Sequence, residues 1–185
     1  QSDELASLTS VRVATLAEIR SRLASDETLI EYFIADEHAY AFVLRGERIV
    51  AVRLAADQLE AEVARFRRAV GDPALVPHEE IARRLYDRLF APLAEHVDTP
   101  NLLFVPHGPL HYVAFAALFD GKQHLVERYG IRVLPSASVL KYIPVGATPK
   151  PGVLLAFGNP DLGDARYRLA RAGDEAIHIA GLLPE

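Results

Sequence analysis

The sequence predicts an α/β domain in which a mostly parallel sheet is flanked by helices and carries an antiparallel meander at one edge. Its clearest strand is the apolar run at residues 101–105, which Pro106 and Gly108 stop. A short continuous apolar run that ends in a tight turn is typical of a strand buried on both faces. The later part of the chain repeats the order strand, turn and helix, which favours parallel pairing.

The antiparallel part of this prediction rests on residues 28–54. Three runs rich in β-branched and aromatic residues, at 29–35, 39–44 and 49–54, alternate with short turns. Turns of that length join neighbouring antiparallel strands, so we expect a three-stranded meander. A short helix should precede it, because Thr15 and Glu18 have the spacing of a capping box.

Two longer helices are expected after the meander. Asp57 and Glu60 repeat the capping-box spacing, and the apolar residues that follow lie on one helical face until Gly71. Residues 79–96 carry a broad apolar stripe that should pack against the sheet. Pro92 should kink or end this second helix, because proline cannot donate the backbone hydrogen bond that a helix interior needs.

The last third of the chain supplies the remaining elements. Residues 130–134 predict another strand, followed by a short helix with Ser136 or Ser138 as its N-cap. Residues 145–152 hold two prolines and two glycines without apolar periodicity, which is typical of an exposed linker. Residues 153–157 predict a second buried strand that ends in a turn at 158–160, and residues 174–183 predict a final helix.

Composition narrows the possible functions. The 185 residues fit one soluble domain, and the net charge of −5 without a dense run of Lys and Arg disfavours direct binding to nucleic acid. No apolar run is long enough to span a membrane and the first residues lack a signal-peptide pattern, so we expect a cytoplasmic protein without a membrane partner. The chain contains no cysteine, which excludes a cysteine nucleophile or a thiolate metal site within it.

Patterns of common catalytic and cofactor sites are missing. The sequence contains none of G-x-S-x-G, G-x-x-x-x-G-K-[ST] and G-x-G-x-x-G. His107 and His111 have the spacing of a helical zinc site, but Pro109 between them disfavours a continuous helix. Asn159, Asp161, Asp164 and Asp174 could together suggest a calcium or magnesium site, but they do not have the spacing of an EF-hand loop. We therefore expect no metal or cofactor, one polar histidine at the strand end and one histidine packed on the turn.

The run at residues 105–140 resembles the pattern of CHAT domains, which are caspase-like domains often preceded by TPR repeats. In that pattern a strand is followed by P-x-G-x-L, by P-F-x-A-L and by a segment that ends in P-S-A. The matching residues are Pro106, Gly108, Leu110, Phe115, Ala117, Leu118, Leu125, Glu127, Tyr129, Pro135, Ser136 and Ala137. Ala114 stands where the family usually has proline. The resemblance extends to F-G-N-P-D-L at 157–162 and to Glu175, which matches a helix opening with A-x-x-E.

The resemblance implies a caspase-like fold and a cysteine endopeptidase function, in which a histidine and a cysteine on neighbouring strand ends attack a peptide bond. The family carries these two residues in H-x-A-t-H-G and L-S-A-C motifs downstream of the matched region, and neither motif occurs here. We therefore expect residues 28–185 to be a truncated, N-terminal part of the domain that is inactive alone. Residues 1–27 would be a helix and linker that enter from an upstream region.

By this resemblance no residue of the chain is expected to be catalytic, and His107 lies in a different turn from the family's histidine. The family-motif positions that we expect to be structural are Pro106, Gly108, Leu110, Phe115, Leu118, Pro135, Ser136, Asn159, Pro160 and Glu175. The implied partners are the downstream catalytic part, a protein or peptide substrate and upstream helical repeats. Two alternatives stay open: a non-catalytic interaction or scaffold module, and a small ligand-binding domain that uses residues 158–160 and the loop at His107.

Overall fold

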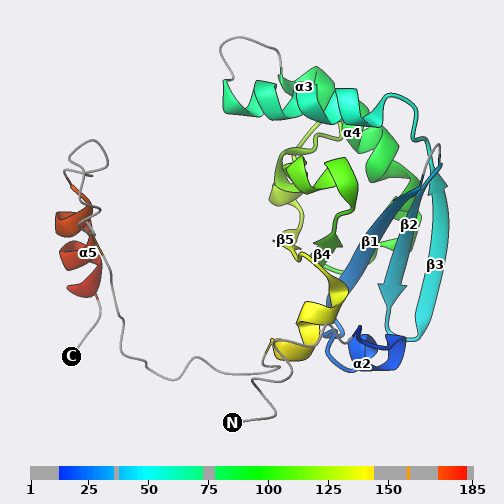
Figure 1. Ribbon diagram of the computed structural model, residues 1–185, viewed down its shortest axis with the longest axis horizontal. Helices are drawn as coiled ribbons and strands as arrows, with labels where there is room; N and C mark the ends of the chain where they lie inside the picture. The colour runs from blue at the N-terminus through cyan, green and yellow to red at the C-terminus, as the bar shows by residue number, and fades with distance from the viewer. Residues whose placement is uncertain (1–12, 36–37, 73–77, 144–157, 159–170, 183–185) are drawn as a thin grey trace. The chain divides into compact units, whose positions relative to one another are not determined.

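The computed structural model describes residues 13–35, 38–72, 78–143, 158 and 171–182. The chain divides into two compact units, residues 1–144 and residues 145–185, and each is described by itself. The first unit contains all the described strands (Figure 1). None of the described helices is both long enough and apolar enough to cross a membrane.

The first unit is built on a five-stranded sheet with the order β3-β2-β1-β4-β5. Its strands are β1 (Glu27–Ala35), β2 (His38–Arg45), β3 (Arg48–Leu54), β4 (Asn101–Val105) and β5 (Gly130–Val133). β1, β2 and β3 form the predicted antiparallel meander, while β4 runs parallel to both β1 and β5. The α/β prediction is confirmed, and parallel and antiparallel pairs are equal in number among the described strands.

β4 is buried on both faces, as its apolar run predicts. Leu102 and Phe104 belong to the larger hydrophobic cluster on one face of the sheet. Leu103 and Val105 belong to a second cluster on the other face. Successive side chains of a strand point to opposite faces, so an uninterrupted apolar run supplies both clusters at once.

Helices α3 (Leu59–Gly71) and α4 (His78–Leu89) cover the larger cluster. α4 ends before Pro92, which lies at the start of the 3-10 helix η1 (Ala91–His96), so the predicted break is confirmed. The predicted cap at Asp57 is wrong: the residue that precedes α3 is Gln58, with a left-handed φ of 53° and no side-chain cap. The Asp57 carboxylate instead lies 3.1 Å from the Arg88 guanidinium of α4, and this ion pair takes the place of the cap.

The opposite face of the sheet is covered by α2 (Leu16–Arg20) and the 3-10 helix η5 (Ala137–Tyr142). The predicted capping box of α2 is present, because the Glu18 N–H donates to Thr15 Oγ1 and the Thr15 N–H donates to the Glu18 carboxylate. Ser136 caps η5 by accepting the Ser138 N–H, as predicted. Ser138 Oγ in turn accepts the Ala14 N–H at 3.0 Å, which ties the start of α2 to η5.

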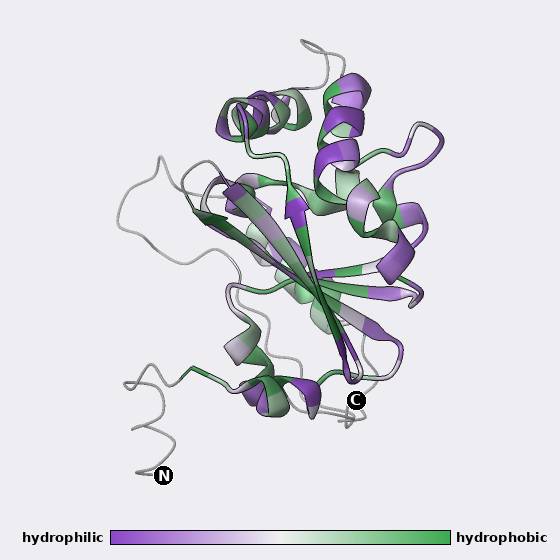
Figure 2. Ribbon diagram, turned by 90° about the vertical axis from the view of Figure 1, so that its right-hand side faces the viewer, coloured by the Kyte–Doolittle hydropathy of each residue, from purple (hydrophilic) through white to green (hydrophobic). Residues whose placement is uncertain are grey.

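Hydrophobic residues concentrate along the strands in the middle of the first unit, and hydrophilic residues occupy the outer turns of its helices (Figure 2). The second unit contains α5 (Ala172–Ala180), which agrees with the final helix predicted at 174–183. The predicted linker at 145–152, the predicted strand at 153–157 and the turn residues Asn159 and Pro160 lie outside the described residues.

Candidate functional site

The chain leaves β4 through Pro106 and His107 and enters the 3-10 helix η2 (Gly108–Tyr112). Gly108 has φ +55°, in the left-handed region that glycine adopts without steric cost. Pro109 follows at the start of η2, where its missing N–H is not needed. The turn thereby directs the side chain of Leu110, which is 1% exposed, back into the larger cluster.

The next motif residues complete an aromatic stack beneath this turn. Phe115 opens the 3-10 helix η3 (Phe115–Ala117), and its ring lies 4.3 Å from that of Phe104 with 9° between the planes. The Tyr32 ring of β1 lies 5.7 Å from Phe115 on the same stack. The Tyr32 hydroxyl donates to the carbonyl oxygen of Leu89 at 3.1 Å, and burial raises the pKa of this phenol well above its usual range. Leu118 is fully buried beside them.

The two histidines of the turn have different surroundings. Nδ1 of His107 accepts the Ile34 N–H at 3.2 Å, and its ring lies 5.1 Å from that of Phe33. His107 therefore joins the end of β4 to the end of β1, as expected for a polar residue at a strand end. His111 is exposed, so the expectation that it packs on the turn is wrong: the short helix η2 turns Leu110 inward and leaves its neighbour in solvent. No group of three metal-binding side chains occurs among the residues that the structure describes.

Of the remaining motif positions, only Pro135 and Ser136 can be compared with this turn, because they are described residues of the same unit. Pro135 and Ser136 connect β5 to η5, on the side of the sheet that carries the second hydrophobic cluster. Glu175 is an exposed residue in the first turn of α5, in the second unit. Asn159 and Pro160 are not among the described residues. Within the described part of the first unit, the structure therefore brings together Pro106, Gly108, Leu110, Phe115 and Leu118.

A loop after η3 holds the most strongly hydrogen-bonded carboxylate of this region. Asp120 Oδ1 accepts the N–H groups of Lys122 and Gln123 at 2.8 and 2.9 Å, and Arg128 lies 3.5 Å from Oδ2. These backbone hydrogen bonds hold the pKa of Asp120 below its usual value. The pKa of the Tyr86 phenol is raised, mainly by burial and to a lesser extent by the negative charge of Asp120. The carboxylate thus orders the loop, and its described hydrogen-bond partners are two backbone N–H groups and a guanidinium.

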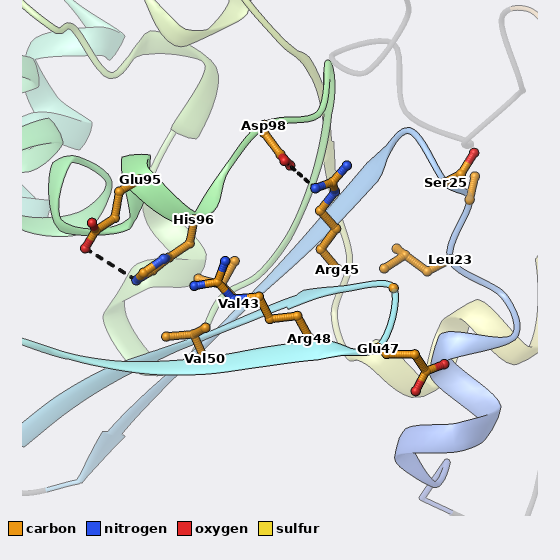
Figure 3. A pocket seen from close by; sticks show the side chains of 12 residues that line it. Leu23, Ser25, Val43, Arg45, Glu47, Arg48, Val50, Glu95, His96 and Asp98 are labelled. Atoms are coloured by element: carbon orange, nitrogen blue, oxygen red, sulfur yellow. Dashed lines mark hydrogen bonds and ion pairs between the residues drawn. The ribbon is translucent and has the colours of Figure 1, made fainter.

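A cavity of about 610 Å³ lies at the other end of the sheet, beside the β2–β3 turn (Figure 3). On one side His96 Nε2 lies 3.6 Å from the Glu95 carboxylate, and His96 Nδ1 is buried with no hydrogen-bond partner in the described structure. On the other side Arg45 pairs with Asp98. The hydroxyl of Ser25 lies at the opposite end of the cavity from His96 (Figure 3). Among the described lining residues the imidazole therefore has no adjacent hydroxyl to deprotonate, so the cavity can bind a ligand but its described lining holds no nucleophile–base pair.

Sequence reasoning identified neither this cavity nor a groove along α3 that is described below. Arg67 and Arg68 were visible in the sequence as part of a charged helix face. Their spacing on α3 indicates only a solvent-exposed helix face. The aromatic ring that Arg67 contacts, Tyr112, is distant in sequence. A pattern of residues close in sequence could therefore not have predicted that Arg67 contacts Tyr112.

Comparison with known proteins gives one family. The model of the CHAT domain family matches residues 79–185, from α4 through α5. No curated protein matches the sequence. Fourteen chains of solved structures match, among them a chain of a PilM-PilN type IV pilus biogenesis complex with a TM-score of 0.29 and 18% identity. That match covers 64% of this chain and 39% of the other, so this chain spans less than half of its length. Because the family match covers more than half of the sequence and includes the whole turn after β4, the chain belongs to the CHAT domain family.

Proposed function

We propose that this chain is the N-terminal, non-catalytic part of a CHAT-type cysteine endopeptidase domain and that it supports a downstream histidine and cysteine. The observation that carries the proposal is the position of the motif residues after β4. Leu110, Phe115 and Leu118 are core side chains and Gly108 shapes a turn, so these positions hold the sheet together and present no reactive group.

The chemistry of a cysteine peptidase supports the same division. Such an enzyme needs a thiolate together with an imidazole that forms or holds it. The chain has no cysteine, and His107 uses its Nδ1 to accept the backbone N–H of Ile34. Both reactive groups would therefore come from the downstream part of the domain.

The sheet offers a surface on which that part could fold. Among the described strands β5 has one neighbour, β4, and the side chain of Val133 on β5 is 54% exposed. A strand edge with unpaired backbone groups favours the addition of another strand. In the second unit Ile177 of α5 and Leu182, which follows this helix, are exposed and apolar, and could pack against added structure. The same proposal includes a protein or peptide substrate, upstream helical repeats that gate the activity and a cytoplasmic location.

The test is hydrolysis of fluorescently labelled casein by the intact protein and by residues 1–185 alone. We expect the intact protein to cleave casein, replacement of the cysteine in its downstream L-S-A-C motif by alanine to abolish cleavage, and residues 1–185 to be inactive. Cleavage by residues 1–185 would refute the non-catalytic role. Cleavage by the intact protein that survives the cysteine replacement would refute the dyad.

A second candidate function is a non-catalytic interaction or scaffold module. The cavity in Figure 3 favours it, because a ligand could bind there while His96 has no nucleophile beside it. Stable binding of a protein partner by the intact protein, with no cleavage of that partner or of casein, would favour this function over the peptidase.

A further inference from the structure

Two adjoining hollows form one groove along α3. The first, of about 630 Å³, lies between α3 and η2, and the second, of about 600 Å³, continues toward the end of β1 at Ile34. Both are lined by Glu60, Ala64 and Pro109, so the two hollows adjoin. We call this the α3 groove. Its lining includes Ile34 near the end of β1 and residues of α3, and the carboxyl ends of parallel strands are where α/β sheets bind ligands.

One end of the α3 groove is cationic. Arg67 and Arg68 line it, are exposed and form no ion pair with any acidic side chain that the structure describes. Neither guanidinium group is therefore neutralised by a neighbouring carboxylate of the described chain, whereas those of Arg84 and Arg88 on α4 are ion-paired. Glu60 is the one acidic residue in the groove lining, so the two guanidinium groups leave this end with a net positive charge.

The guanidinium of Arg67 is also held in place. It lies over the ring of Tyr112 at 4.7 Å from the ring centroid. Stacking on an aromatic face leaves the edge N–H groups of arginine available to a carboxylate. Arg68 Nε donates to the carbonyl oxygen of Ala64 in its own helix at 3.4 Å, which leaves its terminal nitrogens without a partner among the described residues. Both cations are thus positioned before any ligand binds.

The other end of the groove is lined mainly by apolar residues, with Gln58 and Glu60 as its polar residues. Ile34, Ala56 and Leu59 line it, and Pro109 forms the wall that both hollows share. The lining residues on α3 run from Leu59 to Arg68, nine residue steps that correspond to about 14 Å of helix. A stretch of that length matches about four to five residues of an extended peptide. A small carboxylate would occupy one hollow and leave the other empty.

We propose that the α3 groove binds an extended segment of a partner protein in which apolar residues are followed by acidic ones. The apolar side chains would lie between Ile34 and Pro109, and the carboxylates would accept hydrogen bonds from Arg67 and Arg68. The groove belongs entirely to the first unit and needs neither the downstream dyad nor any peptidase activity. Binding at the groove can therefore be tested separately from the proposed function.

The test is fluorescence anisotropy of the full chain with the labelled peptide Leu-Ser-Leu-Ser-Leu-Asp-Asp. We expect it to bind at least about tenfold more tightly than Leu-Ser-Leu-Ser-Leu-Lys-Lys, because charge-assisted hydrogen bonds to two guanidinium groups are lost in the basic peptide. The double variant Arg67→Ala/Arg68→Ala should weaken binding of the acidic peptide by about tenfold or more. Arg65→Ala removes one positive charge from the same helix at a residue that does not line the groove, and it serves as the control for each single change Arg67→Ala and Arg68→Ala, with affinity unchanged within about twofold.

A second variant tests the shape of the groove without changing charge. Ala64 is exposed at the centre of the groove, and Ala64→Gln places a longer side chain there with little effect on helix propensity. We expect this change to weaken binding of the acidic peptide. Equal affinity for the acidic and basic peptides, or an affinity that the Arg67→Ala/Arg68→Ala pair leaves intact, would overturn the proposal. Equally tight binding of acetyl-Asp-Asp alone would show a small-carboxylate site and would overturn the peptide proposal.

Discussion

Gly108 shows how one residue of the family motif acts through backbone geometry. Its φ of +55° lies in the left-handed region, and a Cβ added to it would meet no atom within 4 Å. Gly108→Ala therefore tests conformational strain without a clash, and we expect a loss of about 1 kcal/mol in the free energy of unfolding. Urea denaturation of the full chain measures it.

Gly71→Ala is the matched control for this substitution. Gly71 ends α3, has no positive φ and also has open space around the added Cβ. Alanine is the better helix former, so this variant should be as stable as the parent chain or more stable by up to about 1 kcal/mol. Equal effects of the two alanines would show that the turn does not require the left-handed conformation.

Asp120 gives a pH-dependent prediction. Its folded-state pKa is lowered, chiefly by the N–H groups of Gln123 and Lys122, so the ionised carboxylate stabilises the fold. This stabilisation is complete above the unfolded pKa of about 3.9 and is lost as the pH falls through the lower folded pKa. Asp120→Asn should therefore lower the free energy of unfolding at pH 7, and the difference from the parent chain should shrink toward pH 3. A difference that stays constant over this range would contradict the role of the charge.

At the scale of elements, η3 is held by the aromatic stack. Phe115 is 1% exposed and contacts the rings of Tyr32 and Phe104 from two different strands. Phe115→Ala should cost about 3–5 kcal/mol, because it removes a fully buried ring and leaves a cavity. Val126→Ala, at a side chain 58% exposed, should change stability by less than about 0.5 kcal/mol. Thermal denaturation of both variants measures these losses of stability. Similar losses for Phe115→Ala and Val126→Ala would contradict the role of the aromatic stack.

The elements that the sequence predicted correctly are those with a strong local pattern. The strand at 101–105 combines an apolar run with a proline stop, and Thr15 and Glu18 lie on the same helical turn. The predicted cap at Asp57 has the same spacing but is wrong, because Arg88 on another helix binds that carboxylate. Spacing describes only residues close in sequence, and it carries no information about a competing partner that tertiary packing supplies.

The same reason limits the sequence-based prediction of sites. The α3 groove depends on the contact between Arg67 and Tyr112, which belong to different elements far apart in sequence. The motif residues after β4 could be identified from the sequence because they follow one another closely. The hydrogen bond from the Ile34 N–H to His107 could not be predicted from the sequence, because this contact depends on the parallel pairing of β1 with β4.

At the scale of the molecule, the described hydrophobic clusters lie within the first unit. All members of both clusters fall between Ile19 and Ile143, and no residue of α5 is buried in the described structure. A chain that ends at Pro144 should therefore unfold cooperatively, with a free energy of unfolding within about 1 kcal/mol of the full chain. A broad, non-cooperative urea transition would contradict this.

Removal of residues 1–24 is the contrasting deletion. Ile19 and Leu23 pack against the second cluster, and the Ala14 N–H binds Ser138. Loss of these contacts should lower the free energy of unfolding by about 2 kcal/mol or more. This deletion also tests the predicted boundary at residue 27, because a separate linker could be removed without a loss of stability.

The central claim is that this chain supports a catalytic site and contributes no catalytic group to it. The most direct measurement is kcat for peptide hydrolysis by the intact protein carrying His107→Asn and His111→Asn. Asparagine can still accept the Ile34 N–H through its side-chain oxygen, so the turn after β4 should keep its shape. We predict a kcat within about twofold of the parent protein. A fall of about 10²-fold to 10⁴-fold, the usual contribution of a general base, would contradict the claim.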